Sequence, residues 1–384
     1  MKQPISIVIP VYNSQKYLKE TINSVIKQTF THWELLIIDG GSTDNTASIV
    51  HSYTDTRIKY IPTKKYLDIV DATNKGIHSA SGKYIALLDS DNIMHKNRLL
   101  LQYLFLEKNQ DISLVGSWVQ KIDQNSTFTH HIFRPYISYE LIRIKLLFGN
   151  CISQPSVMIR KSVIQKYKYR SLYKEASDYD LWTRICSKYR IANMPKVLTY
   201  YRVHDSNRST QYDVKKSYIF LDKKIIKNQF TKIEFHLSNS ELEKQFGLEK
   251  KQSFSQNSLK EYEKWLIKLY IFNLENKKFD IKMFNYIIHS YWFRICCLAA
   301  QNGIAAYTIY SNSKISKLTN NKLRMKTLLY ILCIFHINFA FETFSYTWLQ
   351  LNFRNSIKSY LRFFLFSLPI FIGGLTIRKL FIQK

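Results

Sequence analysis

The chain has 384 residues, 46% of them hydrophobic, and a formal net charge of +28 at pH 7. This hydrophobic content excludes a disordered chain and provides enough apolar side chains for one large domain plus a smaller second one. The basic excess predicts an anionic neighbour, either a polyanion or an anionic membrane surface, but does not decide between them.

The first 90 residues alternate between strand-like and helix-like patterns. The predicted strands are β-branched apolar runs, and the segments between them place apolar residues at helical spacing. Strands separated by helices of this length indicate βαβ units and a parallel sheet, which is an α/β architecture of the nucleotide-binding type. The predicted strands are 5–10, 33–39, 57–62 and 83–89, and helices are predicted within 14–29, 40–53 and 68–81.

The rest of the chain divides into a mixed segment and a helical one. A strand is predicted at 114–123, a helix at 137–148, a strand that leads into a helix at 154–164, and an amphipathic helix at 177–189. From about residue 211 the pattern is helical, with a polar stretch at 231–260 that is typical of a linker. We therefore predict an α/β domain at 1–210, a helix and polar linker at 211–260, and a basic, aromatic-rich helical region at 261–384.

Two uncharged runs, 327–341 and 363–377, raise the question of membrane association. Each run has 15 residues, whereas a spanning helix needs about 20. Basic residues beside the runs suit an anionic leaflet, so we expect peripheral, shallow insertion, with buried helical packing as the alternative and a membrane span as the least favoured outcome. These basic residues are Arg354, Lys358, Arg362, Arg378 and Lys379.

The N-terminus and the cysteines indicate the compartment. The first apolar run is short and has no small-residue cleavage pattern, which predicts no secretory signal and a cytoplasmic protein. The five cysteines have no Cys-x-x-Cys spacing, so we expect reduced thiols and neither disulfides nor a zinc cluster.

Polar residues follow several of the predicted strands. Asn13, Asp39 and Asp89 come at the carboxyl ends of three of them, and in open α/β sheets ligands bind at that edge. The turn after the first strand is "PVYNSQ" and contains no glycine, which excludes a dinucleotide site of the GxGxxG type. The sequence therefore predicts a ligand cleft at this edge that is not a dinucleotide site of the GxGxxG type.

The strongest single motif is "YIALLDSDN", residues 84–92, in which a buried strand ends in two aspartates. Asp89 and Asp91 suit a hard divalent cation, Mn²⁺ or Mg²⁺, which prefers carboxylate oxygens and completes its shell with water and substrate phosphate. The alternative is that Asp91 and Asn92 only cap the helix that follows.

Several separated motifs agree with this interpretation. "VIPVYNSQKYLKETINSVIKQT", "ELLIIDGGSTDNT" and "DATNKGIHSASGKYIALLDSDN" are followed by "NCISQPSVMIRKSVI", "SDYDLWTRI" and "LTYYRVH". In this order and spacing they closely resemble the inverting family 2 glycosyltransferases, in particular those that build bacterial cell-surface glycans. The resemblance covers about residues 4–209. It implies the GT-A fold, a mostly parallel sheet between helices, here followed by a C-terminal helical region.

The resemblance also implies roles for individual residues. A nucleotide-diphosphate sugar would be held at the strand ends, a divalent cation would bridge its two phosphates, and a carboxylate would act as the catalytic base. The expected nucleotide-sugar contacts are Pro10, Val11, Tyr12, Asp39, Asp71, Lys75, Asp89 and Ser90; the expected metal ligands are Asp91 and His204; the expected base is Asp178; and Gln154 and Trp182 are expected on the acceptor side.

Other interpretations of some residues stay open at this point. His204 is alternatively a structural histidine, and Trp182 is alternatively part of the core. We expect Asp44 to cap the helix that follows it, and Asp180 either to point away on the helix or to pair with Arg184 four residues later. The chain also departs from the family pattern at three positions: Asn92 replaces a third acidic residue, Ser177 replaces a glutamate before the base, and Thr73 replaces an arginine.

These observations predict a metal-dependent inverting hexosyl- or N-acetylhexosaminyl-transferase that uses Mn²⁺ or Mg²⁺. The expected donor is a UDP-sugar, and the expected acceptor is a hydroxyl of a glycan or polyprenyl-linked saccharide in capsule, O-antigen or exopolysaccharide synthesis. The predicted location is the inner face of the plasma membrane, with no nucleic-acid partner. The alternatives are a nucleotidyltransferase or other nucleotide-sugar enzyme and, less favoured, a polyanion-binding protein.

Overall fold

The computed structural model describes residues 4–205, 207, 212–250, 253–318, 322–334, 371–372 and 375–376. The chain forms two compact units, Met1–Thr343 and Phe344–Lys384. Within the second unit, β10 (Phe371–Ile372) pairs antiparallel with β11 (Leu375–Thr376). All other elements described below belong to the first unit.

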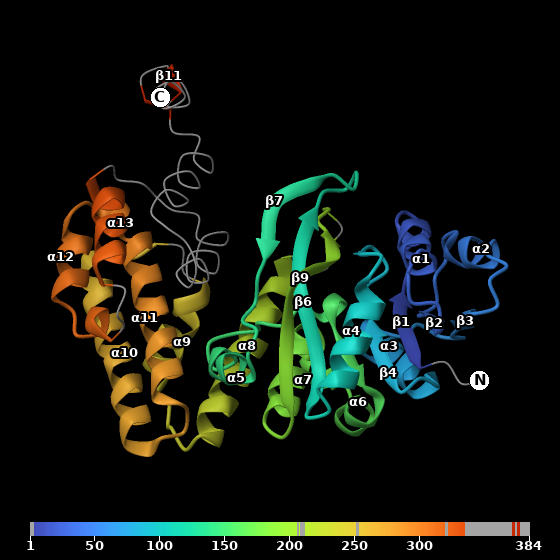
Figure 1. Ribbon diagram of the computed structural model, residues 1–384, viewed down its shortest axis with the longest axis horizontal. Helices are drawn as coiled ribbons and strands as arrows, with labels where there is room; N and C mark the ends of the chain where they lie inside the picture. The colour runs from blue at the N-terminus through green and yellow to red at the C-terminus, as the bar shows by residue number, and fades with distance from the viewer. Residues whose placement is uncertain are drawn as a thin grey trace. The chain divides into compact units, whose positions relative to one another are not determined.

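The N-terminal part consists of successive βαβ units, as the sequence predicts. β1 pairs in parallel with β2 on one side and with β4 on the other, and β3 pairs in parallel with β2 (Figure 1). Every residue of β1 and β2 is buried, as expected for parallel strands covered by helices on both faces. The elements are β1 (Ile5–Val11), α1 (Leu18–Ile26), β2 (Trp33–Asp39), α2 (Thr46–His51), β3 (Ile58–Pro62), α3 (Ile69–Ser79) and β4 (Tyr84–Leu87).

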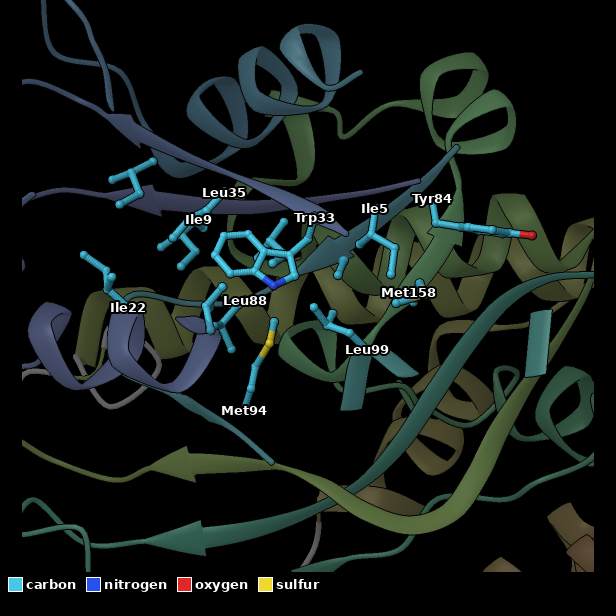
Figure 2. Close-up of a cluster of buried hydrophobic side chains, with 14 of the residues drawn as sticks. Ile5, Ile9, Ile22, Trp33, Leu35, Tyr84, Leu88, Met94, Leu99 and Met158 are labelled. Carbon is cyan, nitrogen blue, oxygen red and sulfur yellow. The ribbon is translucent and has the colours of Figure 1, made fainter. Parts of the chain in front are cut away.

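The core of this part lies between the sheet and the helices α1 and α4 (Arg98–Lys108). Figure 2 shows Trp33 of β2 among aliphatic side chains from β1, β2 and the helices, including Ile5, Ile22 and Leu99. All four side chains are fully buried, and each buried aliphatic side chain stabilises the fold by roughly 1.5–3 kcal/mol. This packing fixes the carboxyl ends of the strands, where the predicted site residues lie.

One glycine of the "NKG" motif allows α3 to lie close to the sheet. A Cβ at Gly76 would come within 2.4 Å of Val8 Cγ1 and 3.0 Å of Ile38 Cγ1. Because real Cβ atoms do not approach so closely, any larger side chain at Gly76 would push α3 away from β1 and β2. The glycine thus has a packing reason that the motif alone does not reveal.

The sheet continues into a mixed region. The strand order is β3-β2-β1-β4-β8-β6-β9-β5, with β7 paired on β6. β8 is antiparallel to both of its neighbours, whereas β6 and β9 are long and parallel to each other (Figure 1). The elements are β5 (Ile93–Met94), β6 (Ile112–Ile122), β7 (Phe128–Phe133), α5 (Tyr139–Lys145), η1 (Gln154–Ser156), β8 (Met158–Arg160), α6 (Lys161–Tyr167), η2 (Ser171–Ala176), α7 (Ser177–Cys186) and β9 (Arg190–Arg202).

The described residues between 212 and 334 are mainly helical, which confirms the predicted C-terminal helical region. The helices are α8 (Tyr212–Lys232), α9 (Asn239–Lys250), α10 (Gln256–Asn276), α11 (Ile281–Leu298), α12 (Ala305–Asn312) and α13 (Lys322–Ile334), with the short turns η4 (Ala300–Asn302) and η5 (Ile315–Lys317) (Figure 1). The linker interpretation of 231–260 is wrong, because α9 and the start of α10 occupy most of this segment. Its polar side chains are the exposed faces of these helices, while α9 buries a short apolar patch at Phe246 and Leu248.

The helical region packs directly on the α/β part. Gln245 of α9 donates from Nε2 to the carbonyl of Leu147 at 3.0 Å and accepts from Trp265 Nε1 at 2.9 Å. Phe148 stacks on Tyr291 of α11 with ring centroids 4.4 Å apart. These contacts explain why the first compact unit extends well past residue 210. The domain boundary at residue 210 stays a prediction from the sequence.

The membrane prediction falls largely outside the described part of the chain. Of the run 327–341 the structure describes only 327–334, within α13, and of 363–377 only the residues of β10 and β11. Among the helices that are described, none is long and apolar enough to cross a bilayer. The five cysteines are free and buried, and their redox state stays a prediction.

Candidate active site

The loops that follow β1 and β2 are bonded to each other by polar side chains. Asn13 N–H donates to Ser42 Oγ at 2.9 Å, and Thr43 N–H donates to Asn13 Oδ1 at 2.9 Å. Asn13 adopts a left-handed conformation with φ 47°, which asparagine tolerates better than most residues. Asp44 accepts from Gln15 N–H and from the N–H of Thr46, the first residue of α2, although Asn45 occupies the N-cap position of that helix.

Asp39 is buried at the end of β2, where both of its carboxylate oxygens accept hydrogen bonds. Oδ1 accepts from Gly41 N–H at 3.0 Å and from Ser42 N–H at 2.7 Å, while Oδ2 accepts from the Tyr60 hydroxyl at 2.5 Å. Burial, followed by the hydrogen bond to the Asp39 carboxylate, raises the pKa of Tyr60 well above its usual value. Asp39 therefore holds the loop that follows it, and its predicted contact with a nucleotide base would use the lone pairs that remain.

The other predicted nucleotide contacts of β1 differ in exposure. Pro10 and Val11 are buried inside the strand, and the Val11 carbonyl accepts from Gly40 N–H at 2.9 Å. Tyr12 is 51% exposed and packs edge-on against Tyr66 with centroids 5.1 Å apart. Of these three residues only Tyr12 thus presents its side chain to solvent, beside a second exposed aromatic ring, Tyr66, that the sequence interpretation did not include.

Asp71 and Lys75 lie on α3. Asp71 is exposed and accepts from the Ser171 hydroxyl of η2 at 3.2 Å, whereas Asp68 forms the N-cap of the helix. Lys75 is partly buried and has no ion pair or hydrogen bond with the described residues. A partly buried ammonium group without a protein partner is suited to an anionic ligand.

The two aspartates after β4 lie in different environments. The pKa of Asp89 is raised to about 7, chiefly by burial and then by the charge on Asp91. A hydrogen bond from Gln154 and the charge on Arg98 oppose this shift, while the charge on Asp178 adds to it. The structure therefore places Gln154 beside Asp89 and brings Asp178, distant in sequence, to the same part of the site.

Asn92 does not cap a helix. It is fully buried, its Nδ2 donates to Asp89 Oδ2 at 3.1 Å, and its Oδ1 accepts from Arg202 N–H at 2.9 Å. The next helix, α4, begins only at Arg98, with Asn97 at its N-cap. The helix-cap interpretation of Asp91 and Asn92 is therefore wrong. An amide also explains the departure from a third acidic residue, because an ionised carboxylate could not donate to Asp89.

Asp91 lies against His204, which follows β9. His204 Nε2 and Asp91 Oδ2 are 3.0 Å apart, and Asn207 Nδ2 donates to the same carboxylate oxygen at 3.3 Å. Two ligands at neighbouring corners of an octahedral shell of about 2.1 Å radius would also lie about 3.0 Å apart, so this pair fits a divalent cation. Within the described residues no group of three or more His, Cys, Asp or Glu side chains forms a metal cage. Phosphate oxygens and water would have to complete the shell.

Ser90, between the two aspartates, connects this turn to the β1 loop. Its hydroxyl lies 2.9 Å from Ser14 Oγ, and its carbonyl accepts from Thr21 Oγ1 of α1 at 2.9 Å. Ser90 thus fixes the turn from the side of α1, and its predicted contact with the donor stays a prediction.

Asp178 lies in the first turn of α7. Its Oδ2 accepts from Asn150 Nδ2 at 2.7 Å, and its Oδ1 accepts from the N–H of Tyr179 at 2.7 Å. Burial raises the pKa of Asp178, and these two hydrogen bonds counteract the shift. The carboxylate is therefore oriented by two donors while remaining a better proton acceptor than an exposed aspartate.

The neighbours of Asp178 in α7 are structural. Asp180 is buried and forms ion pairs with Arg170 and, at 2.9 Å, with Arg184, which confirms the predicted i,i+4 pair. Trp182 is 0% exposed and packs edge-on against Tyr169 with centroids 6.3 Å apart. Trp182 is therefore part of the core, which was the second interpretation of this residue, and its ring has no exposed surface for an acceptor.

Three functional features were missed by the sequence interpretation. Arg98 is fully buried and donates to the carbonyls of Leu87 at 2.9 Å and Val157 at 3.1 Å, beneath the Asp89 turn. Arg202 is equally buried behind Asp91. A charged residue directly after two tyrosines of a predicted strand was the available signal for Arg202, whereas Arg98 follows the polar residues 95–97 and offered no such signal. Burial lowers the pKa of Arg98 to about 9, which the charge on Asp89 opposes.

The third feature is a cluster on α8 and α9 beside Asp178. Asp222 is buried, its Oδ2 lies 3.6 Å from Lys250 Nζ, and its Oδ1 has no hydrogen-bond partner among the described residues. The Lys250 ammonium lies 4.9 Å from the ring centroid of Tyr218. The charges of Asp178 and Lys250 both act on Asp222, which places the helical region at the edge of the site.

The chain resembles several known proteins over its α/β part. The model of the family described as "Glycosyl transferase family 2" matches residues 6–168. The Escherichia coli UDP-Glc:alpha-D-GlcNAc-diphosphoundecaprenol beta-1,3-glucosyltransferase WfgD is 32% identical over 203 residues, 49% of this chain and 77% of that protein. The Escherichia coli O-antigen biosynthesis glycosyltransferase WbnJ is 33% identical over 213 residues, 54% of this chain and 82% of that protein.

A solved structure shows the same fold. The crystal structure of S. aureus TarS 1–349 in complex with UDP-GlcNAc superposes with a TM-score of 0.50 at 17% identity, covering 86% of this chain and 91% of that one. The extent of this match includes helices beyond the family-matched segment. It confirms the predicted fold class.

Proposed function

Because the chain belongs to glycosyl transferase family 2 and is therefore a glycosyltransferase, we propose that it is an inverting enzyme that transfers a sugar from a nucleotide-diphosphate donor to an acceptor hydroxyl. The observation that carries the proposal is the convergence of Asp89, Asp91 and Asp178 at one edge of the sheet. Asp89 is subject to the charges of both other aspartates, although Asp178 lies on a different helix. Carboxylates whose charges act on one another in a buried place are costly unless a ligand or cation uses them.

Asp178 is the proposed catalytic base. As the acceptor oxygen attacks the anomeric carbon, its proton passes to Asp178, a new carbon–oxygen bond forms, and the bond to the nucleotide diphosphate breaks. This single displacement inverts the anomeric configuration and needs no covalent enzyme intermediate. Asn150 and the Tyr179 N–H hold the carboxylate in place, and its raised pKa makes it a stronger proton acceptor than an ordinary aspartate.

The donor is proposed to bind over the loops that follow β1, β2 and β4. Tyr12 offers an exposed ring to the base, Asp39 maintains the shape of the neighbouring loop, and Lys75 provides a free ammonium group for the diphosphate. Asp89 and Gln154, which are hydrogen-bonded to each other, lie where the donor sugar would reach the base Asp178. Asp71, which accepts a hydrogen bond from Ser171, and Ser90, which is hydrogen-bonded to Ser14, are proposed to complete the donor-binding site.

Asp91 and His204 are proposed to hold Mn²⁺ or Mg²⁺. The ion would supply Lewis-acid stabilisation of the negative charge that develops on the leaving diphosphate. For this role the Nε2 lone pair of His204 would be directed at the ion, and Nε2 lies on the side of the ring next to Asp91 Oδ2, 3.0 Å away.

The proposed substrate class is a UDP-sugar and a lipid-linked saccharide in surface-polysaccharide synthesis. Support comes from WfgD, which uses UDP-Glc and a diphosphoundecaprenol-linked sugar, and from WbnJ, an O-antigen enzyme. The net charge of +28 is compatible with work at an anionic inner leaflet, where we place the protein as a peripheral enzyme.

Thermal unfolding with MnCl₂ and a panel of UDP-, GDP- and dTDP-sugars tests the donor. We expect a UDP-sugar plus Mn²⁺ to raise the unfolding temperature more than either alone, because ligands that bind only the folded state stabilise it. Turnover is then measured with an alkyl diphosphate bearing α-linked N-acetylglucosamine as acceptor probe. Release of the nucleoside diphosphate supports the proposal. Release of pyrophosphate, or no response to any nucleotide sugar, would falsify it.

A further inference from the structure

We infer that Arg202, the last residue of β9, is a positioning residue that holds the Asp89–Asn92 turn in the shape required for the cation and the donor. The inference rests on the proposed function, because it concerns how the metal-binding turn is held. Arg202 itself does not touch the carboxylate oxygens of either aspartate. Its effect passes through the backbone of Asp91 and the side chain of Asn92.

Arg202 binds the turn at two points. Its Nε donates to the carbonyl of Asp91 at 2.9 Å, and its backbone N–H donates to Asn92 Oδ1 at 2.9 Å. Asn92 in turn donates from Nδ2 to Asp89 Oδ2 at 3.1 Å. One residue therefore fixes the main chain of the proposed metal ligand and, through Asn92, the rotamer of the other aspartate.

The same strand end also delivers the second proposed metal ligand. His204 follows Arg202 by two residues, and its Nε2 lies 3.0 Å from Asp91 Oδ2. Because Arg202 holds both the end of β9 and the Asp91 carbonyl, it sets the distance between these two side chains. A change at Arg202 is expected to move the two proposed ligands relative to each other.

The far side of the guanidinium group is held by two other parts of the chain. Nη2 donates to Glu20 Oε2 of α1 at 2.7 Å, and Nη1 donates to Ser126 Oγ in the turn between β6 and β7 at 2.8 Å. The group also lies over the ring of Tyr17, 4.5 Å from its centroid. Arg202 thus relates the metal-binding turn to α1 and to the β6–β7 hairpin.

Only arginine can make this set of contacts. Its planar group donates in several fixed directions at once, and at 0% exposure every donor needs a partner inside the protein. A lysine would keep the charge but would lose the simultaneous contacts to Asp91, Glu20 and Ser126. We therefore expect Arg202→Lys to be far from conservative.

The experiment compares Arg202→Lys with Arg160→Lys in the full chain. Arg160 is a matched control, because its guanidinium also binds carbonyls, those of Ile112 at 3.0 Å and Leu106 at 2.8 Å, but it belongs to no part of the proposed site. The readout is the MnCl₂ concentration that gives half of the maximal thermal stabilisation in the presence of UDP, GDP or dTDP. We expect Arg202→Lys to raise this concentration by about tenfold or more, as changes to the residues that hold metal ligands in place do, and Arg160→Lys to leave it unchanged.

A gentler variant covers the case in which Arg202→Lys does not fold. Glu20→Gln removes the ion-pair partner of Arg202 at a carboxylate that is 52% exposed, so we expect a folded protein. It should raise the half-saturating Mn²⁺ concentration in the same direction, by a few-fold. The inference is overturned if the variant that folds is less stable but has the same half-saturating Mn²⁺ concentration as the wild type. Arg202 would then have only a structural role. A wild-type chain that no nucleotide with Mn²⁺ stabilises instead overturns the proposed function.

Discussion

Asn150 donates a hydrogen bond of 2.7 Å from Nδ2 to Oδ2 of Asp178. This bond favours the ionised form of Asp178 and so lowers its pKa, against the larger opposite effect of burial. Asn150→Leu removes the donor, and we therefore expect the pKa of Asp178 to rise. Because the base acts when ionised, the acidic limb of the kcat profile should move to higher pH.

The pH profile separates this effect from a loss of folding. Thermal unfolding of Asn150→Leu at the pH of maximal activity is the control, and it should show a folded protein under the assay conditions. An acidic limb at the same pH as in the wild type would mean that another group limits activity there.

Asp178→Asn should abolish most turnover while the donor still binds. Loss of a general base typically lowers the rate by about 10²–10⁴-fold, and the isosteric amide still accepts from the Tyr179 N–H through its Oδ1. The comparison of kcat with the thermal shift produced by the donor and Mn²⁺ gives the answer. Wild-type turnover by this variant would exclude Asp178 as the base.

The fold of the first 90 residues could be predicted because local signals agree there. Apolar runs such as 33–39 end at turn residues, and the intervening segments show helical periodicity. The insertion of β8 between β4 and β6 could not be predicted, since it depends on antiparallel pairing between segments more than 40 residues apart. α9 was missed because nearly all of its surface is polar, although it buries Gln245 and Leu248.

The candidate site shows the same division. Asp89 and Asp91 were predicted because they follow an apolar strand at the edge of the sheet where ligands bind, and Asp178 because its motif resembles the catalytic-base segment of the family 2 glycosyltransferases. Arg98 was not, because its partners are carbonyls of Leu87 and Val157, which only the folded chain brings near. Asp222 lies outside every recognisable motif, and its place beside Asp178 depends on how α8 packs on α7.

Tyr60→Phe tests the part of the site at Asp39. The variant removes a short hydrogen bond to the Asp39 carboxylate, and hydrogen bonds to charged groups contribute about 1.5–3 kcal/mol. We expect a loss of stability in this range and a higher KM for the nucleotide sugar, with little change in kcat. Tyr103→Phe is the matched control, because the Tyr103 ring packs on Phe30 and Tyr84 while its hydroxyl has no hydrogen-bond partner among the described residues. Equal KM values for the two variants would contradict a role of Asp39 in donor binding.

A chain cut after residue 210 should not fold as an independent domain. The cut removes Tyr291 from Phe148 and Gln245 from the Leu147 carbonyl, and so exposes apolar surface of the α/β part. A chain cut after residue 343 keeps the whole compact unit and is the control. Circular dichroism melting and size-exclusion chromatography should show cooperative unfolding of the longer chain and aggregation of the shorter one. A cooperative transition of the 1–210 chain at the full-length temperature would support the sequence-defined boundary instead.

Asp222 should make the stability of the protein depend on pH. Burial is the main reason that its pKa is raised to about 7, and the charge on Asp178 adds to this, while Lys250 and Tyr218 oppose it. In the unfolded chain an aspartate titrates near 4, so the folded state binds the proton more tightly. The resulting stabilisation is complete below about pH 4 and is lost as the pH rises through about 7.

Asp222→Asn is neutral at every pH and does not lose this stabilisation. We therefore expect the free energy of unfolding of the variant, relative to wild type, to be higher at pH 8.5 than at pH 5, by at most about 3 kcal/mol. Urea unfolding at the two pH values measures this difference. Asp55→Asn is the control, because a hydrogen bond from Arg57 lowers the pKa of Asp55, which is therefore ionised at both pH values. The difference in free energy of unfolding between Asp55→Asn and wild type should be the same at pH 5 and pH 8.5. If the difference for Asp222→Asn is equally independent of pH, Asp222 does not retain a proton in the folded protein.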